Sequence, residues 1–530
     1  MEKLGGVIYR RILVVFIVSL LVLPMLGIYG YHVTIQERNQ PVSQPEELWS
    51  VVVRHEWQPF LEQRLLHQIG SFRSVLILFY NETIFRLFPS RPNDGYIGTV
   101  ELGYYPVDTI RRLNTDVLQY DAIKQHYQRA ANRLRILQEL LGNHGVCMLV
   151  VTPPPKVRVY PEYVAPYLIA PSESIMSQSV SYGDILEESG VQVLNVQRIF
   201  SERKLSSAWP FFTTTSFHWS FWAGCTMAGE IIHKAEVLTK RSFFPIDCSV
   251  VEYGKSKWSD TDIASILNIF STDRIIGNAP FPKIIPQQKT EKSGYKILVI
   301  GDSFSDQIVY AFIRALPDMA WSADWLIRYD SFVKRQTFGR EGNVTSETPL
   351  QLHGALSEIL KKELLILEVS DGNIYRDAAN LKRMEFGATQ VLLDGLLTNN
   401  NGGIIDPANV LTTGWRTFDK KQWCSTGHLA SIVFHPPVNG DSIQLQLDVE
   451  NSALHQQKPH FLTLLLDSKP IGQIMMIRGR GVLNLKVPAK TEWADSLVSE
   501  ISLQYTDGQP LDLILHGISM IGTDTGKNIR

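Results

Sequence analysis

The fold of this chain is decided by residues 295–308, Tyr-Lys-Ile-Leu-Val-Ile-Gly-Asp-Ser-Phe-Ser-Asp-Gln-Ile. Lys296 to Ile300 is a short, nearly continuous apolar run, which is typical of a strand buried on both faces of a parallel sheet. Gly301 interrupts this run. Beyond it, apolar residues recur every fourth position, as on one face of an amphipathic helix. Ser303 therefore stands where a strand turns into a helix.

Two interpretations of Ser303 follow from this position. A serine at such a turn is exposed, and the backbone N–H groups at a helix start carry partial positive charge that can stabilise an oxyanion. Alternatively, Ser303 only caps the helix. The tetrapeptide Gly-Asp-Ser-Phe is too short to decide between them.

Other segments within residues 118–376 also alternate between helix and strand. Tyr120–Leu141 has one apolar helical face and is followed by the apolar run Val146–Val151. A second unit ends in Val191–Val196, and Leu364–Val369 is a further strand. These units predict an α/β fold with a doubly wound parallel sheet, in which ligands bind beyond the carboxyl ends of the strands.

Bulk composition narrows the functional classes. The 530 residues carry a formal net charge of -2, so no overall field favours nucleic acid as a partner. The 13 histidines show no tight metal-ligand spacing, and we expect no metal or cofactor. Of the four cysteines, Cys147 lies in an apolar run and is expected in the core. Cys225 and Cys248 are able to pair if their compartment is oxidising.

The N-terminal region predicts a membrane anchor. Residues 12–30 are overwhelmingly apolar and just long enough to span a bilayer core of roughly 30 Å. Lys3, Arg10 and Arg11 precede them, which places this flank in the cytoplasm and the bulk of the chain in the periplasm, anchored to the inner membrane. A cleaved signal peptide is the alternative. We favour the anchor because the stretch is long and no clear cleavage site follows it.

The C-terminal region has a different period. Beyond Asn399–Gly403, short segments alternate apolar and polar residues and are separated by turn signals, which predicts a β-sandwich. Trp415, Trp423 and Trp493 are candidates for sugar stacking, and filling the sandwich core is at least as good an interpretation for each. The predicted organisation is as follows: residues 1–11 cytoplasmic, 12–30 transmembrane, 31–117 helical stem, 118–376 α/β domain, 377–405 linker and 406–526 β-sandwich, which is a candidate carbohydrate-binding domain.

A candidate histidine lies between the second and third strands. His218 occurs in Thr213-Thr214-Thr215-Ser216-Phe217-His218-Trp219-Ser220, just before a helix-like stretch. A histidine flanked by aromatic residues usually packs in the core or on the surface. Here, however, a run of hydroxyl residues precedes a helix in a chain that already offers a serine at a strand-to-helix turn.

Taken together, these stretches resemble the alginate O-acetyltransferase family, the SGNH hydrolase-like periplasmic proteins that include the alginate-acetylating proteins J and X. The resemblance covers roughly residues 35–375 and rests on the order of four blocks. They are Phe60-Leu61-Glu62-Gln63-Arg64 with Gly70-Ser71-Phe72-Arg73, Leu149–Lys156 with Tyr160-Pro161-Glu162, Asp262-Ile263-Ala264-Ser265-Ile266-Leu267, and Gly301-Asp302-Ser303-Phe304-Ser305. The C-terminal residues Gly414-Trp415, Trp423 and Gly427 are similar, more weakly, to jelly-roll modules of glycan-related proteins.

The resemblance implies roles for individual residues. Ser303 would be the nucleophile and His218 its base, while Ser216 occupies the position of the family's aspartate. A serine brings no charge to stabilise the imidazolium, so three outcomes are open: a Ser–His dyad, an acid supplied from elsewhere, or a site that has drifted toward binding. We also expect oxyanion or substrate contacts from Gly301, Asp302, Lys156, Tyr160 and Trp219.

The implied function is O-acetylation of an exported polysaccharide through an acyl-enzyme, with the acetyl group supplied by a membrane-bound O-acyltransferase. A polysaccharide acetylesterase would use the same two residues. The other alternative is a non-catalytic, membrane-anchored glycan-binding or assembly protein, which Ser216 favours.

Overall fold

The computed structural model describes residue 14 and residues 70–87, 96–99, 103–169, 181–286, 296–316, 322–326, 332–338 and 344–370. Toward the C-terminus it describes residues 392–393, 396–397, 410–412, 415–419, 422–425, 428–434, 443–451, 460–467, 469–476, 479–487, 499–506, 511 and 513–522.

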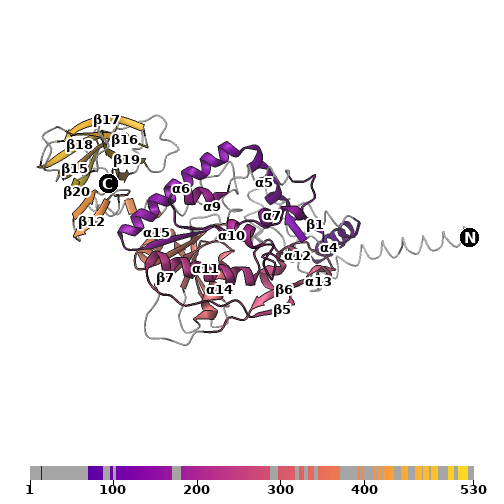
Figure 1. Cartoon of the computed structure of the whole chain (residues 1–530). Coiled ribbons are helices and arrows are strands. Elements are labelled where there is room, and N and C mark those ends of the chain that lie inside the picture. Colours follow the sequence, from indigo (N-terminus) through magenta and orange to yellow (C-terminus); the bar gives the residue numbers. More distant parts are fainter. Residues whose placement is uncertain are drawn as a thin grey trace, which may run out of the picture.

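The centre of the fold is a four-stranded parallel sheet in the order β4-β3-β11-β7 (Figure 1). Its strands are β3 (Cys147–Val151), β4 (Val193–Leu194), β7 (Ile297–Ile300) and β11 (Leu364–Glu368). Leu364 pairs with Cys147 on one side and with Ile297 on the other. All four strands fall within segments that the apolar runs predicted, so the predicted parallel sheet is confirmed.

Helices cover both faces of this sheet because alternate side chains of a strand point to opposite faces. Leu149, Val299 and Ile366 pack into the same core as α11 and α14, whereas their neighbours Leu298 and Leu365 pack into the core that contains α6. The covering helices are α6 (Tyr120–Asn143), α9 (Tyr182–Glu188), α10 (Val196–Arg203), α11 (Phe221–Thr239), α14 (Ser305–Ala315) and α15 (Leu352–Ile359). The result is the doubly wound arrangement that the sequence predicted.

The region predicted as a stem makes direct contacts with the α/β domain. It contains α4 (Gly70–Leu87), β1 (Tyr96–Thr99), β2 (Gly103–Pro106) and α5 (Val107–Leu118). The Asn81 side chain donates to the carbonyl of Leu267, and the Tyr104 N–H donates to the carbonyl of Thr214 at 2.8 Å. These contacts cross the predicted boundary at residue 117, so residues 70–117 help to position loops of the domain.

Short elements lie between the sheet strands and build the surroundings of the candidate site. They are α7 (Lys156–Val159), η1 (Pro161–Tyr163), β5 (Val251–Lys255), η2 (Trp258–Thr261), α12 (Asp262–Ile266), α13 (Thr272–Ile275) and β6 (Asn278–Pro282). An antiparallel meander that the sequence analysis did not anticipate follows α14, with strands β8 (Ser322–Leu326), β9 (Phe332–Phe338) and β10 (Val344–Gln351).

The C-terminal region consists of two antiparallel sheets, as its period-two pattern predicted. One sheet has the order β12-β13-β20-β15-β18 and the other β14-β19-β16-β17. The strands are β12 (Trp415–Asp419), β13 (Gln422–Ser425), β14 (Ala430–Phe434), β15 (Ile443–Asn451), β16 (His460–Leu466), β17 (Lys469–Met476), β18 (Gly479–Val487), β19 (Ser499–Tyr505) and β20 (Leu513–Gly522). Arg135 on α6 forms an ion pair with Glu500 on β19, which ties this region to the α/β domain.

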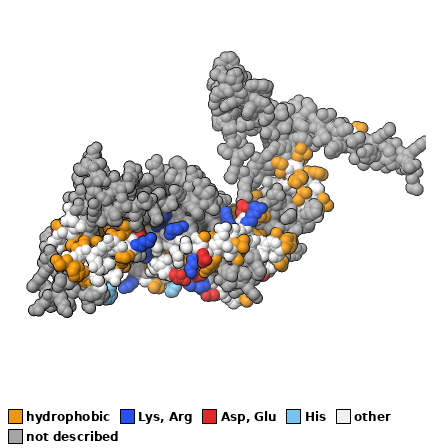
Figure 2. All heavy atoms as spheres, turned by 90° about the horizontal axis from the view of Figure 1, so that it is seen from above, with side chains coloured by type: hydrophobic (Ala, Val, Ile, Leu, Met, Phe, Trp, Pro, Cys, Tyr) orange, Lys and Arg blue, Asp and Glu red, His pale blue; other side chains and the backbone are white. Residues whose placement is uncertain are grey.

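No helix among the described residues is both long and apolar enough to cross a bilayer. The predicted anchor, residues 12–30, lies outside the described residues except for Val14. On the face shown in Figure 2, described Lys and Arg side chains lie near described Asp and Glu side chains.

Candidate active site

Ser303 lies in the sharp turn between β7 and α14. Gly301 is required before this turn, because a Cβ atom there would lie 2.6 Å from Oε2 of Glu368. The first helical residue is Ser305, the N-cap position is occupied by Phe304, and no side chain caps the helix. The capping interpretation of Ser303 is therefore wrong. Its Oγ instead lies 2.7 Å from Nε2 of His218.

His218 is held by the turn that leads into α11. The Ser220 side chain caps this helix by accepting from the Ala223 N–H, and the Ser220 N–H donates to the carbonyl of Phe211. His218 is 6% exposed, and its imidazole contacts the rings of Phe217 and Phe304, with centroid distances of 4.1 and 4.8 Å. The two aromatic neighbours thus restrict the orientation of the imidazole ring.

The partner of the second imidazole nitrogen is Asp262, the first residue of α12. Its Oδ2 lies 2.5 Å from Nδ1 of His218, and its Oδ1 accepts from the Phe217 N–H at 3.1 Å. The carboxylate fixes the proton on Nδ1, so Nε2 is left to accept the Ser303 hydroxyl proton. Of the three outcomes left open by the sequence, the geometry corresponds to an acid supplied from elsewhere.

Ser216 lies beside this pair and does not replace the acid. Its Oγ is within hydrogen-bonding distance of the carbonyls of Ser259 (2.7 Å) and His218 (2.9 Å), and it lies 3.3 Å from Oδ2 of Asp262. It also accepts from the His218 N–H at 2.9 Å. Ser216 therefore fastens the histidine loop to the segment that carries Asp262.

The carboxyl groups next to Ser303 hold the turn itself. Asp302 accepts from the Phe304 N–H at 2.9 Å and from the Ser370 hydroxyl at 2.5 Å, and its own N–H donates to Glu368 at 2.8 Å. The Asp302 carbonyl accepts from the Ser305 N–H at 3.0 Å. Asp302 thus acts on the backbone of the turn and not on a substrate, which corrects that prediction.

Glu368, the last residue of β11, lies beneath the turn and is 1% exposed. Burial raises the pKa of Glu368 well above its ordinary value, and the negative charge of Asp302 adds to this effect. This raised pKa favours the uncharged form of Glu368, whose Oε2 accepts from the Asp302 N–H.

Lys156 does not face the serine. Its ammonium group donates to the carbonyls of Thr213 (2.7 Å), Thr214 (3.0 Å) and Tyr104 (3.2 Å) and lies 4.8 Å from the ring centroid of Tyr105. Burial lowers the pKa of Lys156 to about 7, while the charge of Asp262 acts in the opposite direction. The three carbonyls occupy its three donors, so Lys156 joins β2 to the histidine loop and the predicted oxyanion contact is wrong.

Two other predicted substrate contacts are also structural. The Tyr160 hydroxyl accepts from the Phe211 N–H at 3.1 Å, and burial raises the pKa of Tyr160. Trp219 is fully buried, and its indole donates to Gln307 at 3.0 Å. Both residues brace the segments that carry His218 and Ser303.

The tryptophans proposed for glycan stacking are core residues. Trp415 and Trp423 are each 6% exposed and belong to the cluster that also contains the strands of the C-terminal sheets. Their rings are not available to a sugar in this structure, so the alternative interpretation, core filling, is the right one. Trp493 lies outside the described residues.

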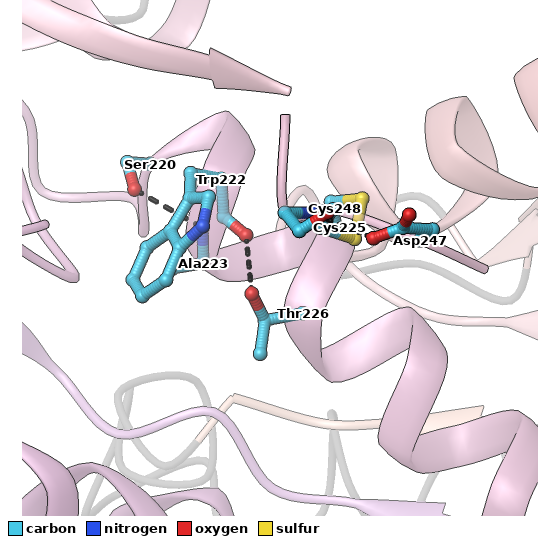
Figure 3. The surroundings of a disulfide bond; sticks show 8 residues. Ser220, Trp222, Ala223, Cys225, Thr226, Asp247 and Cys248 are labelled. Atoms are coloured by element: carbon cyan, nitrogen blue, oxygen red, sulfur yellow. Dashed lines mark hydrogen bonds between the residues drawn. A yellow bond between two sulfur atoms is a disulfide. The ribbon is translucent and has the colours of Figure 1, made fainter. Parts of the chain in front are cut away.

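A disulfide joins α11 to the segment that follows it (Figure 3). Cys225 and Cys248 are bonded, as the sequence allowed for an oxidising compartment, and Cys147 is free and partly buried in β3. A cavity of about 680 Å³ lies along α11 beside the disulfide and is lined in part by Trp222, Thr226 and Ile246. Ser303, His218 and Asp262 are not among its lining residues.

Comparison with known proteins identifies the family of one part of the chain. Residues 113–244, which include His218 and end before Asp262 and Ser303, match the family model of an SGNH hydrolase-like domain, acetyltransferase AlgX. The chain thus contains an SGNH hydrolase-like domain. That domain is of the AlgX acetyltransferase type, so the resemblance to the alginate acetyltransferase J and X family is confirmed over these residues.

Three solved structures that resemble the chain are remote from it in sequence. AlgX of Pseudomonas aeruginosa is 13% identical with a TM-score of 0.34, and the match covers 74% of this chain and 89% of AlgX. The O-acetyltransferase domain of Pseudomonas putida AlgJ is 14% identical with a TM-score of 0.36, covering 56% of this chain and 98% of that domain. A family 35 carbohydrate-binding module from an environmental isolate is 15% identical, with a TM-score of 0.16 and coverage of 24% and 82%. No curated protein matches the chain.

Proposed function

We propose that this chain is an O-acetyltransferase that modifies an exported polysaccharide through an acetyl-enzyme on Ser303. The observation that carries the proposal is the continuous line from Asp262 through His218 to Ser303, with contacts of 2.5 and 2.7 Å. A nucleophile, a base and a group that orients the base are the three parts that this chemistry requires.

In the first half-reaction, the Ser303 hydroxyl attacks the carbonyl carbon of an acetyl ester. Its proton passes to Nε2 of His218, and Asp262 stabilises the resulting imidazolium. When the tetrahedral intermediate breaks down, the donor oxygen leaves with the proton from His218. The acetyl group then remains bonded to Ser303 as an ester.

In the second half-reaction, a sugar hydroxyl replaces the donor. Nε2 of His218 takes the proton of that hydroxyl while its oxygen attacks the acetyl carbon. The new sugar ester departs, and Ser303 recovers its proton from His218. The residues are equally suited to water as the acceptor, so a polysaccharide acetylesterase is the second candidate.

The negative charge of Asp262 favours chemistry over a binding scaffold. The scaffold hypothesis rested on Ser216, which brings no charge to the position of the family's aspartate. Asp262 supplies a carboxylate to the same imidazole from another segment, with Ser216 at 3.3 Å from it. The requirement for an anionic partner of the imidazole is thus met without the family motif.

The proposed setting is the periplasmic side of the inner membrane. The apolar residues 12–30 would anchor the chain, and a membrane-bound O-acyltransferase would supply the acetyl group. The Cys225–Cys248 disulfide supports an oxidising compartment, since such bonds rarely persist in the cytosol.

The test is an assay of the purified full-length chain with an activated acetyl ester and an oligosaccharide, with both products measured. We expect acetylated sugar by mass spectrometry, and we expect Ser303→Ala to abolish it. Ser265→Ala is the matched control, because Ser265 is exposed and its hydroxyl donates to the backbone carbonyl of Thr261. Acetate release without sugar ester would replace the transferase with the esterase. Full activity in Ser303→Ala would exclude catalysis at this serine.

A further inference from the structure

The helix α4 turns polar side chains toward the protein. Asn81 donates to the carbonyls of Leu267 and Asn268 at 3.1 and 3.3 Å. Glu82 accepts from the N–H and the hydroxyl of Ser271 at 3.0 and 2.9 Å, and it is only 9% exposed. Carboxylates are rarely buried in this way. Polar contacts therefore contribute to holding α4 against the segment that follows α12.

The opposite side of α4 is an exposed apolar stripe. Its members, each between 46% and 66% exposed, are Leu76, Phe79, Tyr80 and Leu87. This spacing places all four on one face of an α-helix, since a turn takes 3.6 residues. On a helix of a soluble protein, such a stripe normally faces the core. Here it faces outward, which indicates an apolar partner.

The charges of α4 leave the stripe without a carboxylate of this helix beside it. The only acidic residue of α4 is Glu82, which is turned toward the domain. Its charge is neutralised by Arg86, which is exposed and pairs with it at 2.7 Å. Apolar and aromatic side chains with basic residues at the margin are typical of a helix that lies in the headgroup region of a bilayer.

The position of α4 also suits a membrane. Residues 31–69 separate it from the predicted anchor, residues 12–30. Figure 1 shows α4 at the end of the α/β domain that is remote from the C-terminal sheets, so these sheets do not obstruct a flat surface there. A domain that is tethered to a surface needs only a small contact with it, because the tether raises the effective concentration.

The size of the stripe argues against a second protein chain as the partner. Two aromatic rings and two leucines exposed to this extent present on the order of 400 Å² of apolar surface. A stable protein interface buries about 800 Å² on each partner. The stripe is therefore about half as large as such an interface requires, while a tethered domain can use it to rest on lipid.

We propose that the exposed stripe of α4 lies in the headgroup region of the lipid bilayer and seats the α/β domain on the membrane. The partner is the bilayer itself. This inference rests on the proposed anchoring of the chain through residues 12–30. Because Asn81 and Glu82 hold residues 267–271, just beyond α12, the seating also limits the distance of the Asp262 segment from the membrane surface.

The test measures the accessibility of a nitroxide label at Phe79→Cys. The full-length chain, with Cys147→Val and Cys424→Val to remove the free thiols, is reconstituted in phosphatidylethanolamine–phosphatidylglycerol vesicles. Collisions with oxygen, which dissolves in lipid, and with a water-soluble nickel complex are recorded by electron paramagnetic resonance. We expect nickel collisions about fivefold fewer than at a control position, and more oxygen collisions, because the acyl boundary excludes the polar complex.

The matched control is a label at Val237→Cys. Val237 is an apolar residue of another helix, α11, and it is 65% exposed, like Tyr80. Its exposed neighbours His233 and Lys240 are polar, so it belongs to no apolar stripe. We expect its label to collide freely with the nickel complex, whether or not vesicles are present.

A second variant separates lipid contact from a change in fold. With the label moved to Leu76→Cys, we expect Phe79→Ser/Tyr80→Ser to raise nickel collisions about threefold, since the apolar surface that enters the bilayer is lost. Both residues are exposed, so the urea unfolding midpoint should stay at the parental value. Val237→Ser should leave the label at position 76 unaffected.

Four outcomes would overturn the seating. Nickel collisions at position 79 equal to those at 237 would place the stripe in water. Few collisions with either reagent would mean that protein covers it. Dipolar broadening that disappears when unlabelled chain is added would identify a second copy. Loss of the chain from floated vesicles would remove the anchor as well. None of these measurements requires turnover, so inactivity of Ser303 would leave the result intact.

Discussion

The two sides of the candidate site each rest on a carboxyl group, but in opposite environments. On the histidine side, the Asp262 side chain is 16% exposed and contacts the imidazole at 2.5 Å. On the serine side, Glu368 is 1% exposed and accepts from the Asp302 N–H. Burial and the charge of Asp302 raise the pKa of Glu368, whereas Asp262 has a cationic partner available whenever His218 is protonated.

The difference follows from where charge develops during the proposed reaction. The imidazole gains a positive charge, and an anion beside it lowers the energy of that state. The oxygen attacked at Ser303 becomes negative, and a further anion beneath the serine turn would raise the energy of that state. A carboxyl group held neutral by burial can support the turn without this cost.

The largest effect should come from removing the charge on the histidine side. We expect Asp262→Asn to lower the rate of acetyl transfer by about 10³- to 10⁴-fold, because the amide no longer selects the tautomer or stabilises the imidazolium. The measurement is kcat with a fixed acetyl ester. Asp273→Asn is the matched control, since the Asp273 side chain is 88% exposed. A loss below tenfold in Asp262→Asn would mean that the imidazole works without its acid.

A smaller effect is expected on the serine side, where Glu368 acts as a hydrogen-bond acceptor for the Asp302 N–H and its negative charge is not required. Glu368→Gln keeps an acceptor for the Asp302 N–H and no charge, so we expect kcat at pH 7 within about threefold of the parent. Glu368→Ala leaves that N–H without its acceptor and should cost about 2–4 kcal/mol of unfolding free energy. Urea titration and the same kinetic assay check both variants. If Glu368→Gln were as inactive as Asp262→Asn, the reaction would require an ionised Glu368. The proposed difference between the two carboxyl groups would then be wrong.

The third effect is on stability and concerns Asp260, a carboxyl on the histidine side that resembles Glu368 in its burial. Asp260 is fully buried, neither carboxyl oxygen has a hydrogen-bond partner within the described residues, and burial raises the pKa of Asp260 to about 8. Because the folded state holds this proton more tightly than the unfolded state, the stability that the neutral form contributes is lost as pH rises from about 4 through about 8.

We therefore expect Asp260→Asn to reduce the fall in Tm between pH 5 and pH 8 that the parent shows. Thermal melts at several pH values in that range provide the measurement, again with Asp273→Asn as the exposed control. Parallel pH profiles for the parent and Asp260→Asn would show that Asp260 does not titrate in this window. Burial would then not be what decides the charge state of these carboxyl groups.

The spacing of apolar residues along the chain was sufficient to predict most of the strands and helices. The strand around Val299, the helix from Tyr120 and the strands of the C-terminal sheets all follow from the spacing of apolar residues, since burial on one or two faces fixes that spacing. The meander of β8 to β10 was not predicted, because Phe332–Phe338 and Val344–Gln351 lack a regular alternation of apolar and polar residues and Pro349 lies within the second strand. The burial of Trp415 was left open, since an aromatic residue in a strand suits either face of a sandwich.

The candidate site was predictable in part. Ser303 was identified from the break at Gly301, and His218 through the family resemblance. Asp262 was quoted within that resemblance but received no role, because nothing in its neighbourhood distinguishes it from Asp260, which has a buried and unpartnered carboxyl. Lys156 was assigned to the oxyanion or the substrate through the family resemblance. Its three carbonyl partners lie in β2 and in the histidine loop, more than 50 residues away in sequence, so no local pattern indicated its structural role.

The sequence by itself determined the alternation of strands and helices, the change to a β-sandwich and the serine at a strand-to-helix turn, because these depend on the order and spacing of nearby residues. Tertiary structure alone decided which carboxylate meets the imidazole, which carboxyl is buried beneath the serine turn and that Trp415 and Trp423 lie in the core. Those outcomes depend on burial and on contacts between segments that are distant in sequence, such as His218 with Asp262, which are 44 residues apart. Such contacts exist only once the loops have packed against one another.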